Sequence, residues 1–139
     1  MRPAFTIFEL TLTLCILSIL SAIALPRVGG LLDSIHVRGA ATEIESLFST
    51  ARHLAIARGA LSTVEVDPAK GVMYVSVGED TVRTLDLRTT HDVLLTATRT
   101  RMSYGPTGMG YGAANLSVVV RRNASVDTVL VSRLGRVRR

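Results

Sequence analysis

The sequence predicts an α+β fold in which one long N-terminal helix, membrane-spanning in its first half, packs its second half on an antiparallel β-sheet head. Three observations support this prediction. An apolar run occupies residues 5–25, an amphipathic helical pattern follows it, and strand-like segments separated by turns fill residues 60–139. The 139 residues suffice for one domain with an appended segment, and the 47% apolar content excludes an intrinsically disordered chain.

The apolar run reads FTIFELTLTLCILSILSAIAL. A helix of about 20 residues rises about 30 Å, which is the thickness of the hydrocarbon core of a bilayer. The run therefore predicts a single membrane span followed by an exported domain. A secretory signal peptide is the alternative, because Ala22-Ile23-Ala24 offers a small-residue cleavage site and would leave a soluble secreted domain. Against it, Glu9 interrupts the run, and Arg2 is the one basic residue before it.

Glu9 is the one charged residue in this run. A carboxylate at the centre of a membrane helix costs up to about 3 kcal/mol, and less near the interface. Cleavage before Phe5 would create a cationic α-amine one helical turn from Glu9, or beside the Glu9 of a neighbouring subunit. Opposite charges about 4 Å apart attract by roughly 4 kcal/mol at an intermediate effective dielectric. The carboxylate is thus explained as half of an ion pair that proteolysis completes.

Residues 26–59 continue the helix as its amphipathic half. Pro26 lacks an amide hydrogen and predicts a kink or a local loosening of the helix. Apolar residues recur at helical spacing over residues 36–58, and Gly59 is a typical C-terminal stop. The predicted stripe comprises Val37, Ala40, Ala41, Ile44, Leu47, Phe48, Ala51, Leu54 and Ala55. Such a stripe requires a partner surface.

Residues 60–139 supply that surface as a β-rich head with a basic tail. Val64 and Val66 alternate with acidic residues, and turn-forming residues separate the segments that follow. We expect an antiparallel sheet of six or seven strands and a glycine-rich loop over residues 105–112. The expected strands cover residues 64–67, 72–77, 81–87, 93–97, 101–104, 116–122 and 126–132.

The formal net charge of +5 is a C-terminal feature. Residues 121–139 contain six arginines and one aspartate, which gives +5, while the rest of the chain is neutral. Clustered guanidinium groups donate bidentate hydrogen bonds to phosphate, which makes part of the tail a candidate contact for DNA or another polyanion. The alternative is a solvated last strand that promotes solubility or docks on an acidic neighbour. The candidate contact residues are Arg133, Arg136, Arg138 and Arg139.

No catalytic or metal-binding pattern is present in the sequence. His36, His53 and His91 are too scattered for a helical zinc site, and the single cysteine excludes a disulfide framework and a Cys-rich metal site. Neither a G-x-S-x-G elbow nor a P-loop is found. We therefore expect a protein that is not an enzyme and that has no cofactor and no metal.

Residues 4–10, Ala-Phe-Thr-Ile-Phe-Glu-Leu, resemble the class III signal of type IV pilins and type II secretion pseudopilins. That pattern has a short basic leader, a small residue, Phe-Thr-x-x-Glu-Leu and a long apolar run, and Glu9 and Pro26 fall where the family has the same residues. The resemblance implies a leader over residues 1–4. Prepilin peptidase would cut between Ala4 and Phe5 and N-methylate Phe5. Ala4 replaces the usual glycine.

Three further segments resemble the minor pseudopilin H family, GspH/FimT. They are ARHLAIARG at residues 51–59, YGPTG at 104–108 (similar to the family's F-x-P-x-G) and GRV at 135–137. The resemblance implies a single-pass inner-membrane protein with a periplasmic head. It would join other major and minor pseudopilins on the inner-membrane platform of type II secretion. The alternative is a FimT-like minor type IV pilin that binds DNA through its tail during DNA uptake, because residues 135–138 also resemble a G-R-x-R tail.

Overall fold

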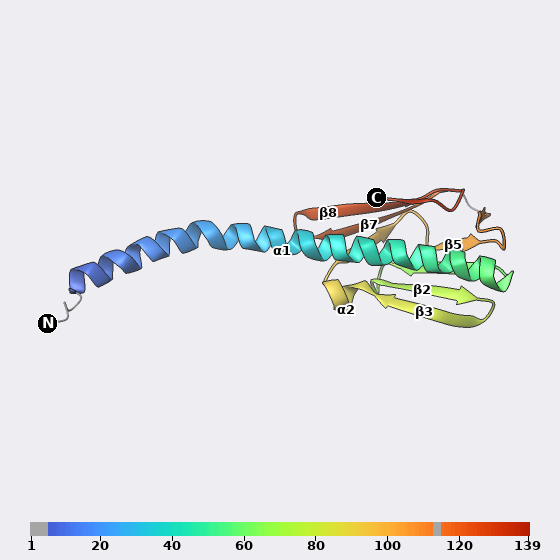
Figure 1. Ribbon diagram of the computed structural model, residues 1–139, viewed down its shortest axis with the longest axis horizontal. Helices are drawn as coiled ribbons and strands as arrows, with labels where there is room; N and C mark the ends of the chain where they lie inside the picture. The colour runs from blue at the N-terminus through green and yellow to red at the C-terminus, as the bar shows by residue number, and fades with distance from the viewer. Residues whose placement is uncertain (1–5, 113–114) are drawn as a thin grey trace. The chain divides into compact units, whose positions relative to one another are not determined.

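The computed structural model describes residues 6–112 and 115–139. The chain divides into two compact units, Met1–Leu32 and Asp33–Arg139, and the second is called the head below. Helix α1 (Ile7–Arg58) contributes residues to both units (Figure 1).

In the first unit, all described residues belong to the start of α1 or precede it, and all are exposed. This part of α1 is long and apolar enough to cross a membrane. Several of its hydroxyl groups donate within the helix: Thr11 Oγ1 donates to the Phe8 carbonyl at 2.9 Å, Thr13 Oγ1 to the Leu10 carbonyl at 2.8 Å, and Ser18 Oγ to the Leu14 carbonyl at 2.8 Å. Such internal bonding lets polar side chains lie in an apolar environment at little cost.

The head contains two antiparallel sheets and a short helix, α2 (Leu87–His91). The five-stranded sheet A has the order β3-β2-β1-β5-β6, and the four-stranded sheet B has the order β4-β7-β8-β9. The bounds in sheet A are β1 (Ser62–Asp67), β2 (Val72–Val77), β3 (Asp80–Asp86), β5 (Arg101–Tyr104) and β6 (Gly110–Tyr111). Those in sheet B are β4 (Leu94–Ala97), β7 (Leu116–Arg122), β8 (Ser125–Val131) and β9 (Val137–Arg138).

The core of the head is one apolar cluster drawn from the second half of α1 and from both sheets. The predicted helical stripe is confirmed, because its residues from Val37 to Ala55 are buried and Leu54 packs against the cluster. The sheets contribute alternate residues, such as Met73 and Val75 of β2 and Val118 and Val120 of β7. One face of each sheet is thereby covered, and the opposite face of sheet B carries the exposed side chains of Leu94, Val126 and Leu130.

The α+β class is confirmed, and three details of the predicted head are wrong. The strands form two sheets instead of one. The strand expected over residues 81–87 ends at Asp86, whose side chain caps α2 by accepting the Thr89 amide at 2.9 Å. The loop expected over residues 105–112 contains β6, and the basic tail contains β9. Elements of two to five residues are too short to leave a periodic pattern in the sequence.

Candidate functional site

The C-terminal arginines lie on a hairpin that a glycine closes. The Gly135 amide donates to the Ser132 carbonyl at 2.9 Å, and the Ser132 amide donates to the Arg136 carbonyl at 2.8 Å. Gly135 has a φ of +76°, a left-handed conformation that glycine adopts without steric cost. The turn therefore holds β9 against β8 and sets where its arginines emerge.

Gly135 also lies where the three segments that resemble the GspH/FimT family pack against one another. A Cβ at this position would lie 2.7 Å from the Gly108 carbonyl oxygen and 3.1 Å from Tyr104 Cε1. A Cβ on Gly108 would in turn lie 2.8 Å from Cδ1 of Ile56, close to the end of α1. The three segments are far apart in the sequence and meet at one place in the head.

Tyr104 fills the space beside this junction. Its side chain is fully buried, and its hydroxyl has no hydrogen-bond partner among the described residues. Burial raises the pKa of Tyr104 to about 12, in spite of the opposing effect of the nearby Arg52 guanidinium. The phenol is therefore neutral at physiological pH and serves as a packing group.

The four tail arginines differ in their surroundings. Arg139 Nε donates to Asp127 Oδ2 at 2.5 Å, so this guanidinium is neutralised within the head. The other three, Arg133, Arg136 and Arg138, are exposed. Their side chains have no ion pair or hydrogen bond within residues 6–112 and 115–139. These three are the ones available to an anionic partner.

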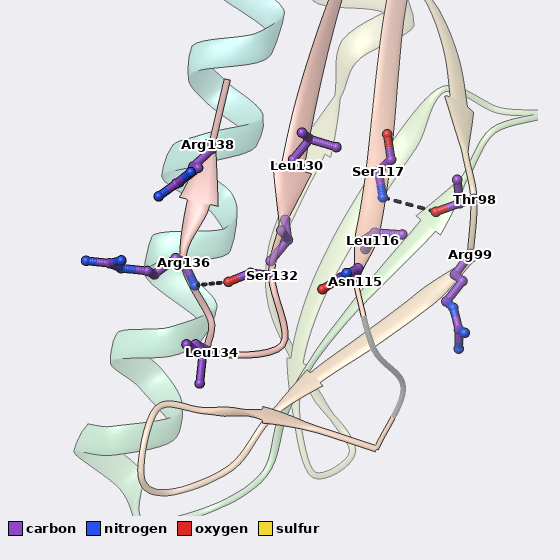
Figure 2. A pocket seen from close by; sticks show the side chains of 11 residues that line it. Thr98, Arg99, Asn115, Leu116, Ser117, Leu130, Ser132, Leu134, Arg136 and Arg138 are labelled. Atoms are coloured by element: carbon purple, nitrogen blue, oxygen red, sulfur yellow. Dashed lines mark hydrogen bonds between the residues drawn. The ribbon is translucent and has the colours of Figure 1, made fainter.

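Two grooves border β9. The first, called the leucine groove, has a volume of about 570 Å³ and lies on sheet B, where Figure 2 shows Arg99 on one side and the β9 arginines on the other. Its floor and rim are formed by Leu116, Leu130, Leu134, Arg99, Arg136 and Arg138. The second, called the polar groove, has a volume of about 840 Å³ and is lined by α1 residues, including Glu45, Arg52 and His53, and by residues 135–139. Both grooves fit anionic ligands better than cationic ones.

A polar cluster that the sequence analysis did not single out ties the β7–β8 hairpin to α1. Arg122 Nε donates to Asp33 Oδ1 at 2.9 Å, and Arg122 Nη1 donates to the His91 carbonyl at 2.8 Å. Asn123 Nδ2 donates to Asp33 Oδ2 at 2.9 Å across a sequence separation of 90 residues. The sequence shows Arg122-Asn123 at a hairpin turn and offers no signal that pairs them with Asp33.

The three histidines do not form a metal site. The His36 and His91 rings meet edge to face with centroids 6.2 Å apart, and His91 Nε2 lies 3.2 Å from Glu43 Oε1. Among the described residues, no group of three or more His, Cys, Asp or Glu side chains is arranged to hold a metal ion.

The residues expected to act in processing and assembly belong to the start of the chain. Ala4 and Phe5 lie outside the described residues. Glu9 is exposed in the first turn of α1, its amide donates to Thr6 Oγ1 at 3.2 Å, and its carboxylate has no ion pair in the part of the chain that the structure describes. The helix is continuous through Pro26, where a kink stays a prediction.

Comparison with known proteins identifies the head. The family model described as "Type II transport protein GspH" matches residues 40–135. The chain belongs to the GspH family. No curated protein matches the sequence.

Solved structures show the same fold as this GspH-family chain. The type IV minor pilin FimU of Pseudomonas aeruginosa has a TM-score of 0.64 at 13% identity, covering 73% of this chain and 86% of that chain. The minor pseudopilin EpsH of the Vibrio cholerae type 2 secretion system has a TM-score of 0.58 at 10% identity, covering 74% of this chain and 94% of that chain. The predicted pilin-like fold is confirmed.

Family and fold together define the kind of protein. This GspH-family chain is a pilin-like structural subunit and not an enzyme. It is a membrane-anchored protein with a soluble head, and it assembles with other pilin-like subunits.

Proposed function

We propose that this GspH-family chain is an H-type minor pseudopilin, a structural subunit of the pseudopilus of a type II secretion system involved in protein export. The observation that carries assembly into a pilin-like filament is Glu9, the one charged residue in an exposed apolar helix segment that reaches Leu25. The match of residues 40–135 to the family described as "Type II transport protein GspH" favours the secretion system over a type IV pilus. Neighbouring hydroxyls, such as that of Thr11, are bonded to helix carbonyls, whereas the Glu9 carboxylate has no ion pair within the described residues. A partner from outside the helix explains its presence.

Processing supplies that partner in the proposed mechanism. Prepilin peptidase removes residues 1–4 by cutting between Ala4 and Phe5, and then N-methylates Phe5. The new Phe5 amine of one subunit pairs with Glu9 of its neighbour as the subunit leaves the inner membrane. The pair offsets an insertion penalty of up to about 3 kcal/mol. Pro26 allows the helix to adjust during extraction.

The proposal also assigns a location to the apolar helix segment and to the head. Residues 5–25 anchor the subunit as a single pass in the inner membrane, and the head lies in the periplasm. The partners are the major and minor pseudopilins of the same filament and the inner-membrane platform that drives assembly. The head sets the lateral contacts.

The test replaces the carboxylate and reads out assembly. Glu9→Ala removes the charge, so the subunit should insert in the membrane at normal levels and fail to enter the filament. Glu79→Ala, which removes an exposed carboxylate from the β2–β3 turn, is the matched control. Normal incorporation of Glu9→Ala would refute the pairing role. Sequencing of the mature N-terminus should begin at Phe5, and an intact leader or a start after Ala24 would refute the processing scheme.

A second candidate function is favoured by the three exposed tail arginines. In this alternative the chain is a FimT-like minor type IV pilin whose tail binds DNA during uptake. Each phosphate contact contributes about −0.9 to the slope of log affinity against log salt on double-stranded DNA, so three arginines predict a slope of about −2.7. Because Arg139 is held by Asp127, it is not counted.

The DNA test uses the full chain in nonionic detergent. Binding to a mixed-sequence duplex is measured at several salt concentrations, for the parent and for a triple variant in which Arg133, Arg136 and Arg138 become Ala. The control variant is Arg121→Ala, which removes an exposed arginine from the end of β7 that is remote from the leucine groove. A flat salt response, or unchanged binding by the triple variant, would remove this candidate.

A further inference from the structure

The leucine groove combines two features that are uncommon together on a solvent-facing sheet. Leu130 and Leu134 are 51% and 62% exposed although they are large apolar side chains. Three arginines lie beside them: Arg99, Arg136 and Arg138. The described residues that line the groove include no aspartate or glutamate. An exposed apolar floor with a rim of one charge sign marks a surface for a partner of the opposite sign.

The strand register gives the groove a definite width. Ser117 pairs with Leu130, and Leu130 pairs with Arg138, so these side chains form a row across the outer face of sheet B. Thr98 extends the row, because its Oγ1 accepts the Ser117 amide at 3.0 Å (Figure 2). Three steps between neighbouring strands of about 4.8 Å place the two ends of the row about 14 Å apart. Arg99 follows Thr98, so cationic groups lie at both ends with leucine between them.

An extended peptide matches these dimensions. Residues i, i+2 and i+4 of an extended chain point to the same side, and at about 3.4 Å per residue they span about 14 Å. We propose that the leucine groove binds an extended segment of a partner protein with acidic residues at i and i+4 and an aliphatic residue at i+2. The aliphatic side chain contacts Leu130 and Leu134, while the carboxylates accept hydrogen bonds from Arg99 at one end and from Arg138 at the other.

The same features disfavour other anionic partners at this groove. Single-stranded nucleic acid uses aromatic side chains as stacking platforms, and the floor consists of leucines. A phospholipid carries its charge at one end, whereas the groove presents cations at two. The peptide is therefore the occupant that uses both the floor and the whole rim. The inference holds for a subunit of either filament and is tested outside any filament, so its failure leaves the assembly proposal untouched.

The experiment measures binding of the labelled peptide Asp-Thr-Leu-Thr-Asp to the full chain in nanodiscs of zwitterionic lipid, by fluorescence anisotropy. Two control peptides carry the same charge: Asp-Thr-Ser-Thr-Asp removes the aliphatic group, and Asp-Asp-Thr-Leu-Thr changes the spacing. The variants are Leu130→Ser and Arg138→Gln. Arg121→Gln is the matched control, because it removes one positive charge from the same face of sheet B about 14 Å along β7 from Ser117, the nearest groove residue on that strand.

We expect Leu130→Ser and Arg138→Gln each to weaken peptide binding by about tenfold, which corresponds to about 1.4 kcal/mol. Arg121→Gln should change it less than twofold, and both control peptides should bind at least fivefold more weakly than the parent peptide. Equal binding of the three peptides would overturn the proposal, since it would show that charge alone is recognised. It would also be overturned if oligothymidylate or phosphatidylglycerol vesicles, and not the peptide, bound in a manner that depends on Leu130. Circular dichroism of each variant verifies that the head is folded, and Leu130→Ala replaces Leu130→Ser if it is not.

Discussion

The close contact at Gly135 gives the sharpest prediction about the head. Gly135→Ala places a Cβ at a φ of +76° and 2.7 Å from the Gly108 carbonyl oxygen. The left-handed conformation costs about 1–2 kcal/mol for a residue other than glycine. Displacing a backbone carbonyl from a packed position adds about 1–3 kcal/mol. We therefore expect the free energy of unfolding to fall by about 3 kcal/mol, a large part of the 5–15 kcal/mol typical of a domain.

Gly59→Ala separates the two contributions. Gly59 has a φ of +58°, also left-handed, and a Cβ there would meet no atom within 4 Å. This variant should therefore lose about 1–2 kcal/mol, from the backbone conformation alone.

Urea unfolding of the full chain in nonionic detergent, followed by far-ultraviolet circular dichroism, measures both variants. Hydrogen exchange should show faster exchange of the Ser132 and Gly135 amides in Gly135→Ala and unchanged exchange in Gly59→Ala, because these amides hold the β8–β9 turn. Equal losses of stability in the two variants would refute the argument that the contact with Gly108 requires glycine.

Two further predictions concern buried and partly buried polar groups. The pKa of Tyr104 is raised to about 12 in the folded head, so the unfolded chain releases this proton first, and stability should fall as pH rises from about 10 towards 12. Tyr104→Phe should abolish this part of the alkaline decline and leave stability at pH 7 unchanged or slightly higher; an unaltered alkaline profile would contradict the burial argument. Arg122→Met removes hydrogen bonds to Asp33 and to the His91 carbonyl, so it should lower the free energy of unfolding by about 2 kcal/mol, whereas Arg121→Met should change it by less than about 0.5 kcal/mol. Chemical denaturation of both variants checks this, and equal losses would show that the cluster around Asp33 is not stabilising.

The parts of the fold that depend on local periodicity could be predicted from the sequence. The stripe on α1 repeats with the helical period, so residues from Val37 to Ala55 could be assigned to the core without knowing what covers them. The same holds for β1, where the buried Val64 and Val66 alternate with half-buried residues. The partition into two sheets could not be predicted, because it depends on pairings between distant segments. One of them is the bond from the Val66 amide to the Thr100 carbonyl at 2.8 Å.

The candidate site was predictable in its composition and not in its geometry. The concentration of arginine in the tail is visible in the sequence, and so are the segments that contain Gly108 and Gly135. The ion pair between Asp127 and Arg139 follows from the pairing of β8 with β9. The position of Arg99 on the rim of the leucine groove follows from the pairing of β4 with β7, because Arg99 comes soon after the end of β4. Charge counting alone therefore overstates the number of tail arginines available to a partner.

The Asp33 cluster has a mechanical consequence. Asp33 is the first residue of the head, and tension applied along α1 enters the head there. Arg122 and Asn123 donate hydrogen bonds to its carboxylate from the β7–β8 hairpin, so the force is transmitted to two paired strands. When a subunit is pulled by its N-terminal helix, the hydrogen bonds from Arg122 and Asn123 to Asp33 must therefore break before the start of the head's helix can separate from the hairpin.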